Sequence, residues 1–299
     1  LPISFATMIL SILYNRYLSI IAGLYIVFFT TLIGGSNIST AIISFCTALV
    51  GVFVNEKVEK RTDFLRGGMI VGIINIFIII SVALIQEIPV LNMNFLKIIG
   101  IAGASGFINS ILVLGILPLY ENIFGITTKF KLLELSDLNA EIFKEMLMKA
   151  PGTYNHSMLV STISEAACKE IGANHLLARV GAYYHDIGKI ADAGMYIENR
   201  VTDPRAKDLS PLEYAQLIIS HVEKGIAIAR KNLLPESVID FIRQHHGQTT
   251  MTFFYHQALE GVDSSSRVEI HKDDFQYPAP RPSNKETAIV MLADSIEAA

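Results

Sequence analysis

Long apolar runs fill the first 120 residues of this 299-residue chain. A short run at 3–14 is followed by four longer ones, at 17–33, 38–54, 68–85 and 95–119. Each of the four is near the ~20 residues that cross ~30 Å of hydrocarbon as a helix. Buried helices of soluble proteins keep a polar face, whereas these runs hold almost no charge. The pattern predicts four membrane-spanning helices, preceded by a truncated span that lacks the marks of a signal peptide.

Charges between the runs predict the orientation of these helices. Basic residues crowd the connection after residue 54, at Lys57, Lys60, Arg61 and Arg66, while the turn at 34–37 is uncharged. Because basic loops stay on the cytoplasmic side, this connection is expected there. The next run then leads out and the last run leads back in. Everything after residue 119 is therefore predicted to be cytoplasmic, in a protein that crosses the cell membrane several times.

Small and polar residues interrupt the apolar runs at a few places. Gly100, Gly103 and Gly106 lie three apart in the last run and predict close packing against another helix. Asn75 and Asn109 are expected to hydrogen-bond neighbouring helices, with a ligand site as the alternative.

A sharp change of composition follows the last run. Charged residues return in 121–150, and apolar residues recur there at helical spacing, which predicts a pair of short amphipathic helices. This joint is either a passive tether or a route by which membrane movement reaches the rest of the chain. We therefore expect an all-α chain with three parts: transmembrane helices in 1–120, a juxtamembrane linker in 121–150 and a helical domain in 151–299.

Capping residues delimit four helices of the last part. Each has a candidate N-cap before it or a glycine that ends it: Asn174 before 175–187, Ser210 with Glu213 at 210–231, Gly247 after 236–246, and Ser283 with Glu286 before the helix of Asp294.

Histidine and aspartate side chains recur on the apolar faces of separate helices, at His156, His185, Asp186, His221, His245, His246 and Asp294. One such histidine is usually a satisfied core residue. Seven groups together are costly to bury unless they share cations. The adjacent pair in GAYYHDIGK offers an imidazole and a carboxylate that can bridge two cations. By contrast, His175, His256 and His271 lie at a helix start or in polar loops and are expected at the surface.

Composition argues against nucleic-acid binding and against cysteine-based disulfide or zinc sites. The net charge of −4 argues against a nucleic-acid polymer as a partner, because phosphate-backbone binding needs clustered Lys and Arg. Cys46 and Cys168 are too few and too differently placed for a disulfide framework or a thiolate zinc site. The hydrophobic share of 51% agrees with a lipid bilayer as a partner.

The order of the histidines and aspartates resembles the metal-binding pattern of HD-domain phosphohydrolases. His221 and the doublet His245–His246 imply the two-metal form. The stretches ILPLYENIFGITTKFKLLELSDLNAEIFKEMLMKAPGTYNHS, LLARVGAYYHDIGKI and TAIVMLADSIEAA resemble the membrane-anchored 7TM-HD family, and the resemblance covers nearly the whole chain. Members of that family carry two more transmembrane helices and a large extracellular domain upstream, and further residues downstream, so the chain is expected to be a fragment cut at both ends.

This resemblance implies a function. One divalent ion would be held by His156, His185, Asp186 and Asp294, and the other by Asp186, His221, His245 and His246. Iron or manganese suits these ligands, with zinc or nickel as substitutes in vitro. Two ions would activate a bridging water for in-line attack on phosphorus, and Lys189 would neutralise charge on the phosphate. The resemblance thus implies cyclic di-AMP as substrate, 5′-pApA as product, Asp186 and Lys189 as catalytic residues, and a signal from the membrane or extracellular side.

Two departures from related families bear on the substrate. The chain reads HHGQTTMTFFY where HD-GYP enzymes carry a GYP triplet, which argues against cyclic di-GMP. Asp203-Pro204-Arg205 replaces the Asn-Pro-His stretch usual in the 7TM-HD family, so no substrate contact is assigned there. Four aromatic residues could stack on a base: Phe253, Phe254, Tyr255 and Tyr277. Aromatic runs are more often part of a hydrophobic core, so none of them is assigned to a nucleotide pocket.

Two alternatives stay open. One keeps the chemistry and changes the substrate to another cyclic nucleotide. The other is a membrane receptor that binds a nucleotide without cutting it. A homo-oligomer is neither required nor excluded.

Overall fold

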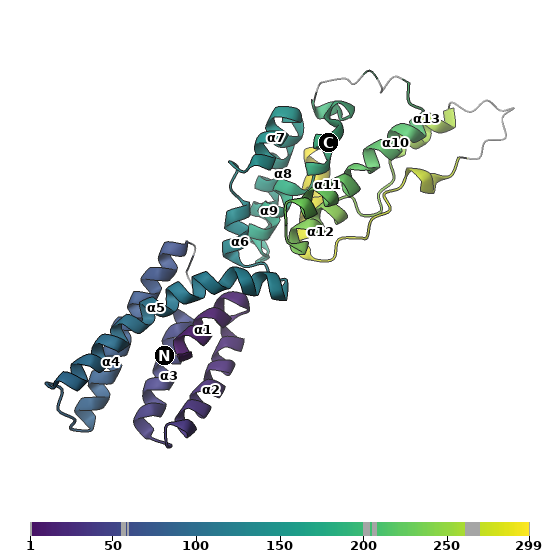
Figure 1. The fold of residues 1–299 in the computed structure, drawn as a ribbon. Coiled ribbons are helices and arrows are strands. Elements are labelled where there is room, and N and C mark those ends of the chain that lie inside the picture. Colours follow the sequence, from purple (N-terminus) through teal and green to yellow (C-terminus); the bar gives the residue numbers. More distant parts are fainter. Residues whose placement is uncertain are drawn as a thin grey trace. The chain divides into compact units, whose positions relative to one another are not determined.

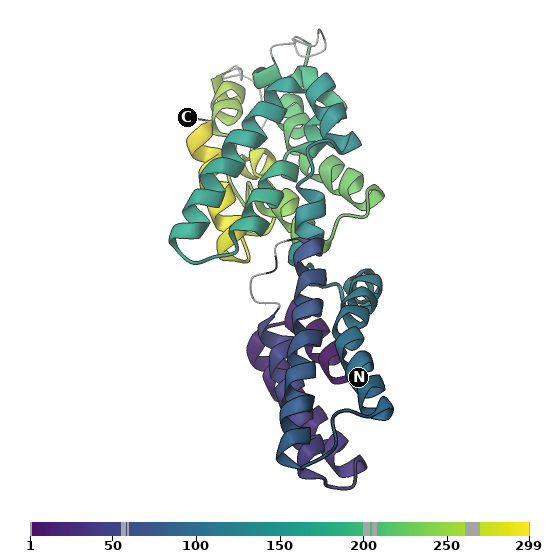
Figure 2. The ribbon, with the colours of Figure 1, turned by 90° about the vertical axis from the view of Figure 1, so that its left-hand side faces the viewer.

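The computed structural model describes residues 2–54, 58, 60–199, 204, 208–260 and 270–298. The chain divides into two compact units, Leu1–Lys131 and Leu132–Ala299, and each is built of helices (Figures 1 and 2). No β-strand forms in the described residues, where one isolated bridge joins Thr250 and Gln276. The all-α prediction is confirmed. Lys57, Asp203 and Arg205 lie outside the described residues.

Five apolar helices make up the described part of the first unit: α1 (Pro2–Leu13), α2 (Arg16–Ile33), α3 (Ile38–Phe53), α4 (Arg61–Ile85) and α5 (Met93–Phe124). Helices α2, α4 and α5 are long and apolar enough to cross a membrane. Helix α3 has 16 residues, and at about 1.5 Å per residue it falls short of the ~30 Å of hydrocarbon. All four predicted runs are helical, and one of them is shorter than a usual span.

Glycines let α4 and α5 pack closely. A Cβ at Gly72 would lie 2.1 Å from the carbonyl oxygen of Gly103, and one at Gly106 would lie 2.2 Å from that of Gly68. Gly103 and Gly106 therefore pack as predicted. For Gly100 the prediction is wrong, because no atom lies within 4 Å of its Cβ position.

The two asparagines predicted to bond neighbouring helices do so. Asn75 on α4 accepts a hydrogen bond of 2.9 Å from Thr47 Oγ1 on α3. Asn109 on α5 donates one of 2.7 Å to Ser4 Oγ on α1. Each bond satisfies a polar group that would be costly to leave unpaired among apolar helices.

Helix α6 (Lys129–Leu135) runs across the boundary between the units. The second unit then contains these elements: α7 (Glu141–Lys149), α8 (Pro151–Glu170), α9 (His175–Tyr184), η1 (Ile187–Met195), η2 (Ile197–Asn199), α10 (Pro211–Ile219), α11 (His221–Lys231), α12 (Glu236–Gln244), α13 (Thr252–Glu260), η4 (Lys272–Phe275) and α14 (Lys285–Glu297).

Two clusters of buried side chains hold the second unit together. In one, Phe143 of α7 packs with Tyr184 and Ile187, the residues on either side of the His185–Asp186 pair. The Tyr184 hydroxyl also donates a hydrogen bond of 3.0 Å to the Leu135 carbonyl of α6. The other cluster joins α8, α9, α12 and α14. The core thus fixes the turn that carries the histidine and aspartate.

Three predicted helices differ in extent from those observed, and the helix at 236–246 ends two residues early, at Gln244. The helix at 175–187 ends at Tyr184, and η1 begins at Ile187, so the His185–Asp186 pair lies in the turn between them. The helix at 210–231 is divided at Ser220, and His221 opens its second part, α11. The capping box of Ser210 is present.

The predicted cap of the last helix is wrong by one residue. Asn284 caps α14, because its side-chain oxygen accepts a hydrogen bond of 2.8 Å from the Thr287 amide. Glu286, the predicted partner of Ser283, instead accepts a bond of 2.7 Å from the amide of Asn174.

Candidate metal centre

Close contacts at two glycines bring α11 and α12 to the His185–Asp186 turn. A Cβ at Gly181 would lie 2.3 Å from the Phe241 ring of α12, and one at Gly188 would lie 1.9 Å from the carbonyl oxygen of His221. Only glycine permits these approaches. Helices α11 and α12 can therefore present their histidines directly to Asp186.

Three of the histidines are oriented by backbone carbonyls near helix ends. The Nδ1 atoms of His185, His221 and His245 lie 2.7, 2.6 and 3.0 Å from the carbonyl oxygens of Ala182, Ile218 and Ile242. Carbonyls in the last turn of a helix are free to accept such bonds. Because Nδ1–H donates to a carbonyl, the Nε2 atom of each ring faces Asp186.

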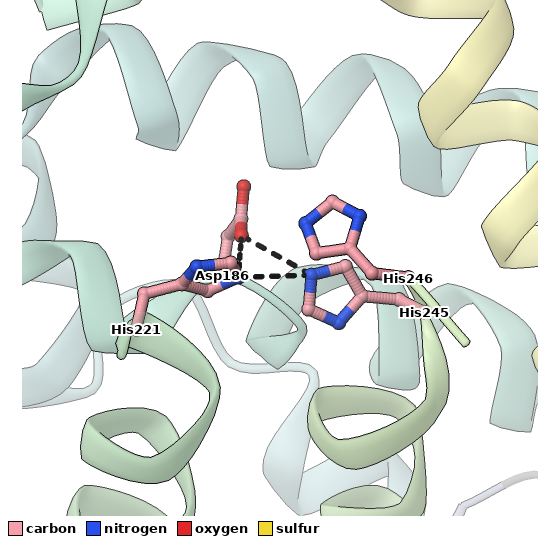
Figure 3. A group of neighbouring side chains, drawn as sticks. All are labelled: Asp186, His221, His245 and His246. Carbon is pink, nitrogen blue, oxygen red and sulfur yellow. Dashed lines mark hydrogen bonds and ion pairs between the residues drawn. The ribbon is translucent and has the colours of Figure 1, made fainter. Parts of the chain in front are cut away.

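Asp186 lies at the middle of the cluster, with its two oxygens facing different histidines. Its Oδ1 is 3.4 Å from His221 Nε2 and 3.6 Å from His245 Nε2 (Figure 3). Its Oδ2 is 3.3 Å from His185 Nε2 and 3.6 Å from His156 Nε2. One carboxylate therefore connects two sets of imidazoles.

Asp294 on α14 closes the cluster from another side. Its Oδ1 lies 2.9 Å from His156 Nε2 and 3.8 Å from His185 Nε2. Its Oδ2 lies 3.7 Å from His246 Nδ1. The structure thus brings all seven residues singled out by the sequence together, from α8, α9, α11, α12 and α14 and the turns that follow α9 and α12.

Unpaired polar atoms mark the centre as a site for cations. His185 is 0% exposed and Asp186 is 1% exposed. No well-formed hydrogen bond reaches three buried atoms of this pair, His185 Nε2, Asp186 Oδ1 and Asp186 Oδ2, or the Nε2 of neighbouring His156. Charged groups lie near two of these atoms, Lys189 near Asp186 Oδ2 and Asp294 near His156 Nε2, but burial without a well-formed hydrogen bond is unfavourable. Two groups have ligand atoms within 4.8 Å of one another, and both include Asp186: Asp186, His221, His245 and His246, and His156, His185 and Asp186.

Electrostatics divide the histidines into two kinds. Burial lowers the pKa of His185, but the charges and hydrogen bonds of Asp186 and Asp294 together outweigh burial and raise that pKa to about 10. Burial dominates at His221 and lowers its pKa to about 3. The pKa of Asp186 is held well below its usual value, because Lys189 and His185 outweigh its burial. Without a metal, the carboxylate is thus balanced by Lys189 and His185, while His221 stays neutral and able to bind a cation.

Lys189 reaches the centre, as its place after the His-Asp pair suggested. Its Nζ lies 2.7 Å from Asp186 Oδ2 and 3.1 Å from Glu198 Oε1. Glu198 in turn accepts a hydrogen bond of 3.1 Å from Thr153 Oγ1 on α8. Glu198 was not singled out from the sequence, where nothing marks its position in η2. Glu297 was not singled out either, although it lies one turn after Asp294 on the same helix and pairs with His156 Nδ1.

Two hollows open beside the centre. One has a volume of about 610 Å³ and is lined with aromatic side chains, among them Tyr196, Tyr214, Phe253, Phe254 and Tyr277. The other has a volume of about 750 Å³ and is lined by more polar residues of α8 and α14. Both are lined by Lys189, Ile197, Glu198 and His246. Phe253 is 70% exposed there and is not a core residue, whereas Tyr277 is 6% exposed, as expected of a core residue.

The remaining candidates lie away from the centre. Tyr255 does not line either hollow, and its ring packs against Phe275 at 5.7 Å. His175, His256 and His271 are exposed, which confirms the expectation that they are surface residues.

A helical unit in which a His-Asp turn collects histidines from neighbouring helices is the arrangement of a metal-dependent HD domain. The HD domain family matches residues 153–299, and the family described as "7TM receptor with intracellular HD hydrolase" matches residues 1–128. The chain belongs to this family of membrane proteins that carry an HD hydrolase domain.

Similar proteins agree with this assignment. Two relatives named cyclic-di-AMP phosphodiesterase PgpH come from Bacillus subtilis and Listeria monocytogenes. They are 36% and 37% identical over 307 and 302 residues, which is 100% of this chain and 42% and 41% of the relatives. The chain thus spans about two fifths of their length. A crystal structure of the L. monocytogenes phosphodiesterase PgpH HD domain in complex with cyclic-di-AMP matches with a TM-score of 0.50 and 40% identity, over 55% of this chain and 74% of that one.

Proposed function

We propose that the second unit is a two-metal phosphodiesterase that hydrolyses cyclic di-AMP to 5′-pApA. The observation that carries this proposal is the position of Asp186, whose two oxygens face two separate sets of histidines. The substrate follows from the relatives named as cyclic-di-AMP phosphodiesterases and from the related domain in complex with cyclic-di-AMP.

Two ligand sets share the bridging carboxylate. One ion would be held by His156, His185, Asp186 and Asp294, and the other by Asp186, His221, His245 and His246. Ligand atoms bound to one ion at ~2.0–2.2 Å lie roughly 3.0–3.5 Å from one another. Asp186 lies 3.3 to 3.6 Å from four histidines, so two of these separations fall within that range and two lie about 0.1 Å above it. Imidazole and carboxylate without thiolate favour iron or manganese.

The chain's own residues position the phosphodiester. When bound, the ions activate a water and neutralise charge on the phosphate. Lys189 lines both hollows, so its ammonium group reaches a phosphate held at the centre and stabilises charge that develops there. Glu198 and Asp186 hold that ammonium in place. The ribose 3′-oxygen leaves, so the product keeps its phosphate on the 5′-oxygen.

A product analysis over a panel of nucleotides tests this function. The full chain is loaded with Mn²⁺ or Fe²⁺ and incubated with cyclic di-AMP, cyclic di-GMP and a linear dinucleotide, and the products are separated by chromatography. We expect 5′-pApA from cyclic di-AMP, and no product from a variant with both His185→Ala and Asp186→Ala. Tight binding of cyclic di-AMP without turnover in either metal would show a receptor instead.

We further propose that the second unit faces the cytoplasm and that residues 121–150 join it to the membrane helices. The basic residues at the start of α4, Arg61 and Arg66, with Lys60 before it, support this orientation. Labelling of single cysteines in intact cells tests it. A cysteine introduced at exposed Glu170 should be protected from a membrane-impermeant reagent, and labelling there would reverse the orientation.

A further inference from the structure

His156 is oriented differently from the three histidines that use backbone carbonyls. It lies within α8, where the carbonyls of the preceding turn already bond to amides further along the helix. A backbone acceptor is therefore not free for its Nδ1–H. The Glu297 carboxylate of α14 takes that place and accepts from His156 Nδ1.

Two carboxylates of α14 lie at the two nitrogens of the His156 imidazole ring. Asp294 and Glu297 are three residues apart, so they lie on the same face of the helix. Asp294 Oδ1 lies 2.9 Å from Nε2, and Glu297 pairs with Nδ1. The side chains of His156 and Glu297 are 10% and 23% exposed, so water competes little for this contact.

We infer that Glu297 is a positioning residue that fixes the tautomer and direction of His156 for metal binding. A carboxylate on the outer nitrogen of a metal-binding histidine keeps the proton there, directs the other lone pair to the ion and makes the ring a better ligand. This inference rests on the proposed metal centre, and it assigns Glu297 no contact with the ion or the phosphate.

Titration of the metal-free full chain with Mn²⁺ alone tests the role of Glu297. Glu297→Ala should weaken Mn²⁺ binding by about 10–100-fold, the usual effect of removing such a partner. Glu297→Gln is nearly isosteric and keeps an acceptor for Nδ1–H, so it should lose less. Glu170→Ala is the matched control, since it removes one exposed carboxylate from α8, about 21 Å along the helix from His156. It should bind Mn²⁺ as the parent chain does.

A double-mutant cycle separates positioning from a general structural effect. If Glu297 acts through His156, then Glu297→Ala should change Mn²⁺ binding no further in a His156→Ala background. Equal weakening in both backgrounds, or unchanged binding in Glu297→Ala alone, would overturn the inference. Mn²⁺ binding with the expected response to Glu297 but no hydrolysis of cyclic di-AMP would reject the proposed function and leave this inference standing.

Discussion

At the scale of single residues, the metal centre was readable where chemistry alone marks a residue. Histidines and aspartates on apolar faces are conspicuous, because burying them unpaired is unfavourable. Glu198 and Glu297 were not readable, because each acts only through a partner brought near by folding, Lys189 and His156. Ser283 and Asn284 can both cap a helix, and the folded structure shows that Asn284 bonds the Thr287 amide while Glu286 bonds the Asn174 amide.

Metal binding at this centre should strengthen as the pH rises from 6 to 8. The pKa of His185 is raised to about 10 in the absence of metal, because the charges and hydrogen bonds of Asp186 and Asp294 together outweigh the effect of burial. An ion must therefore displace a proton from the ring, so affinity rises with pH by about tenfold per unit for each proton displaced. Calorimetry of Mn²⁺ binding in buffers of different ionisation enthalpy measures both quantities. Constant affinity without proton release would contradict this account.

At the scale of elements, apolar periodicity predicts which segments form helices better than it predicts where those helices end. No glycine or proline marks the break at Ser220, yet it places His221 at the start of α11 with its Nδ1 on the Ile218 carbonyl. The glycine of GAYYHDIGK that precedes Lys189 has a clearer tertiary role. Gly188 lets η1 touch the backbone of α11.

Gly188→Ala should separate Asp186 from His221. The added methyl group would lie 1.9 Å from the His221 carbonyl oxygen, and such overpacking typically destabilises a core by ~1–3 kcal/mol. We expect weaker Mn²⁺ binding together with a lower unfolding temperature of the second unit. Gly100→Ala is the control, because its Cβ position meets no atom within 4 Å. Mn²⁺ affinity equal to that of the parent chain in Gly188→Ala would show that this contact does not set the geometry.

At the scale of the whole molecule, hydropathy separates an apolar first unit from a second unit that carries the chemistry. The buried clusters keep to this division: those containing Phe143 and Phe241 lie in the second unit, and those containing Phe64 and Val27 lie in the first. A hydropathy pattern reports which residues avoid water, and it carries no information on how two separately packed units are arranged.

Residues 132–299 expressed alone should fold and bind metal. The second unit contains its own core and all seven proposed ligands. We expect a helical circular dichroism spectrum, a cooperative thermal transition and Mn²⁺ affinity within about threefold of the full chain, since independent sites lose little when separated. A fragment that is unfolded with Mn²⁺ present would show that the first unit is required for folding.

The dependence of 5′-pApA formation on the number of Mn²⁺ ions bound per chain tests the proposed two-metal phosphodiesterase most directly. Asp186 faces both sets of histidines, so activity is predicted to appear only as the second ion binds and to be absent from Asp186→Ala at any loading. Full activity with one ion per chain, or cleavage of cyclic di-AMP by Asp186→Ala at the rate of the parent chain, would contradict it.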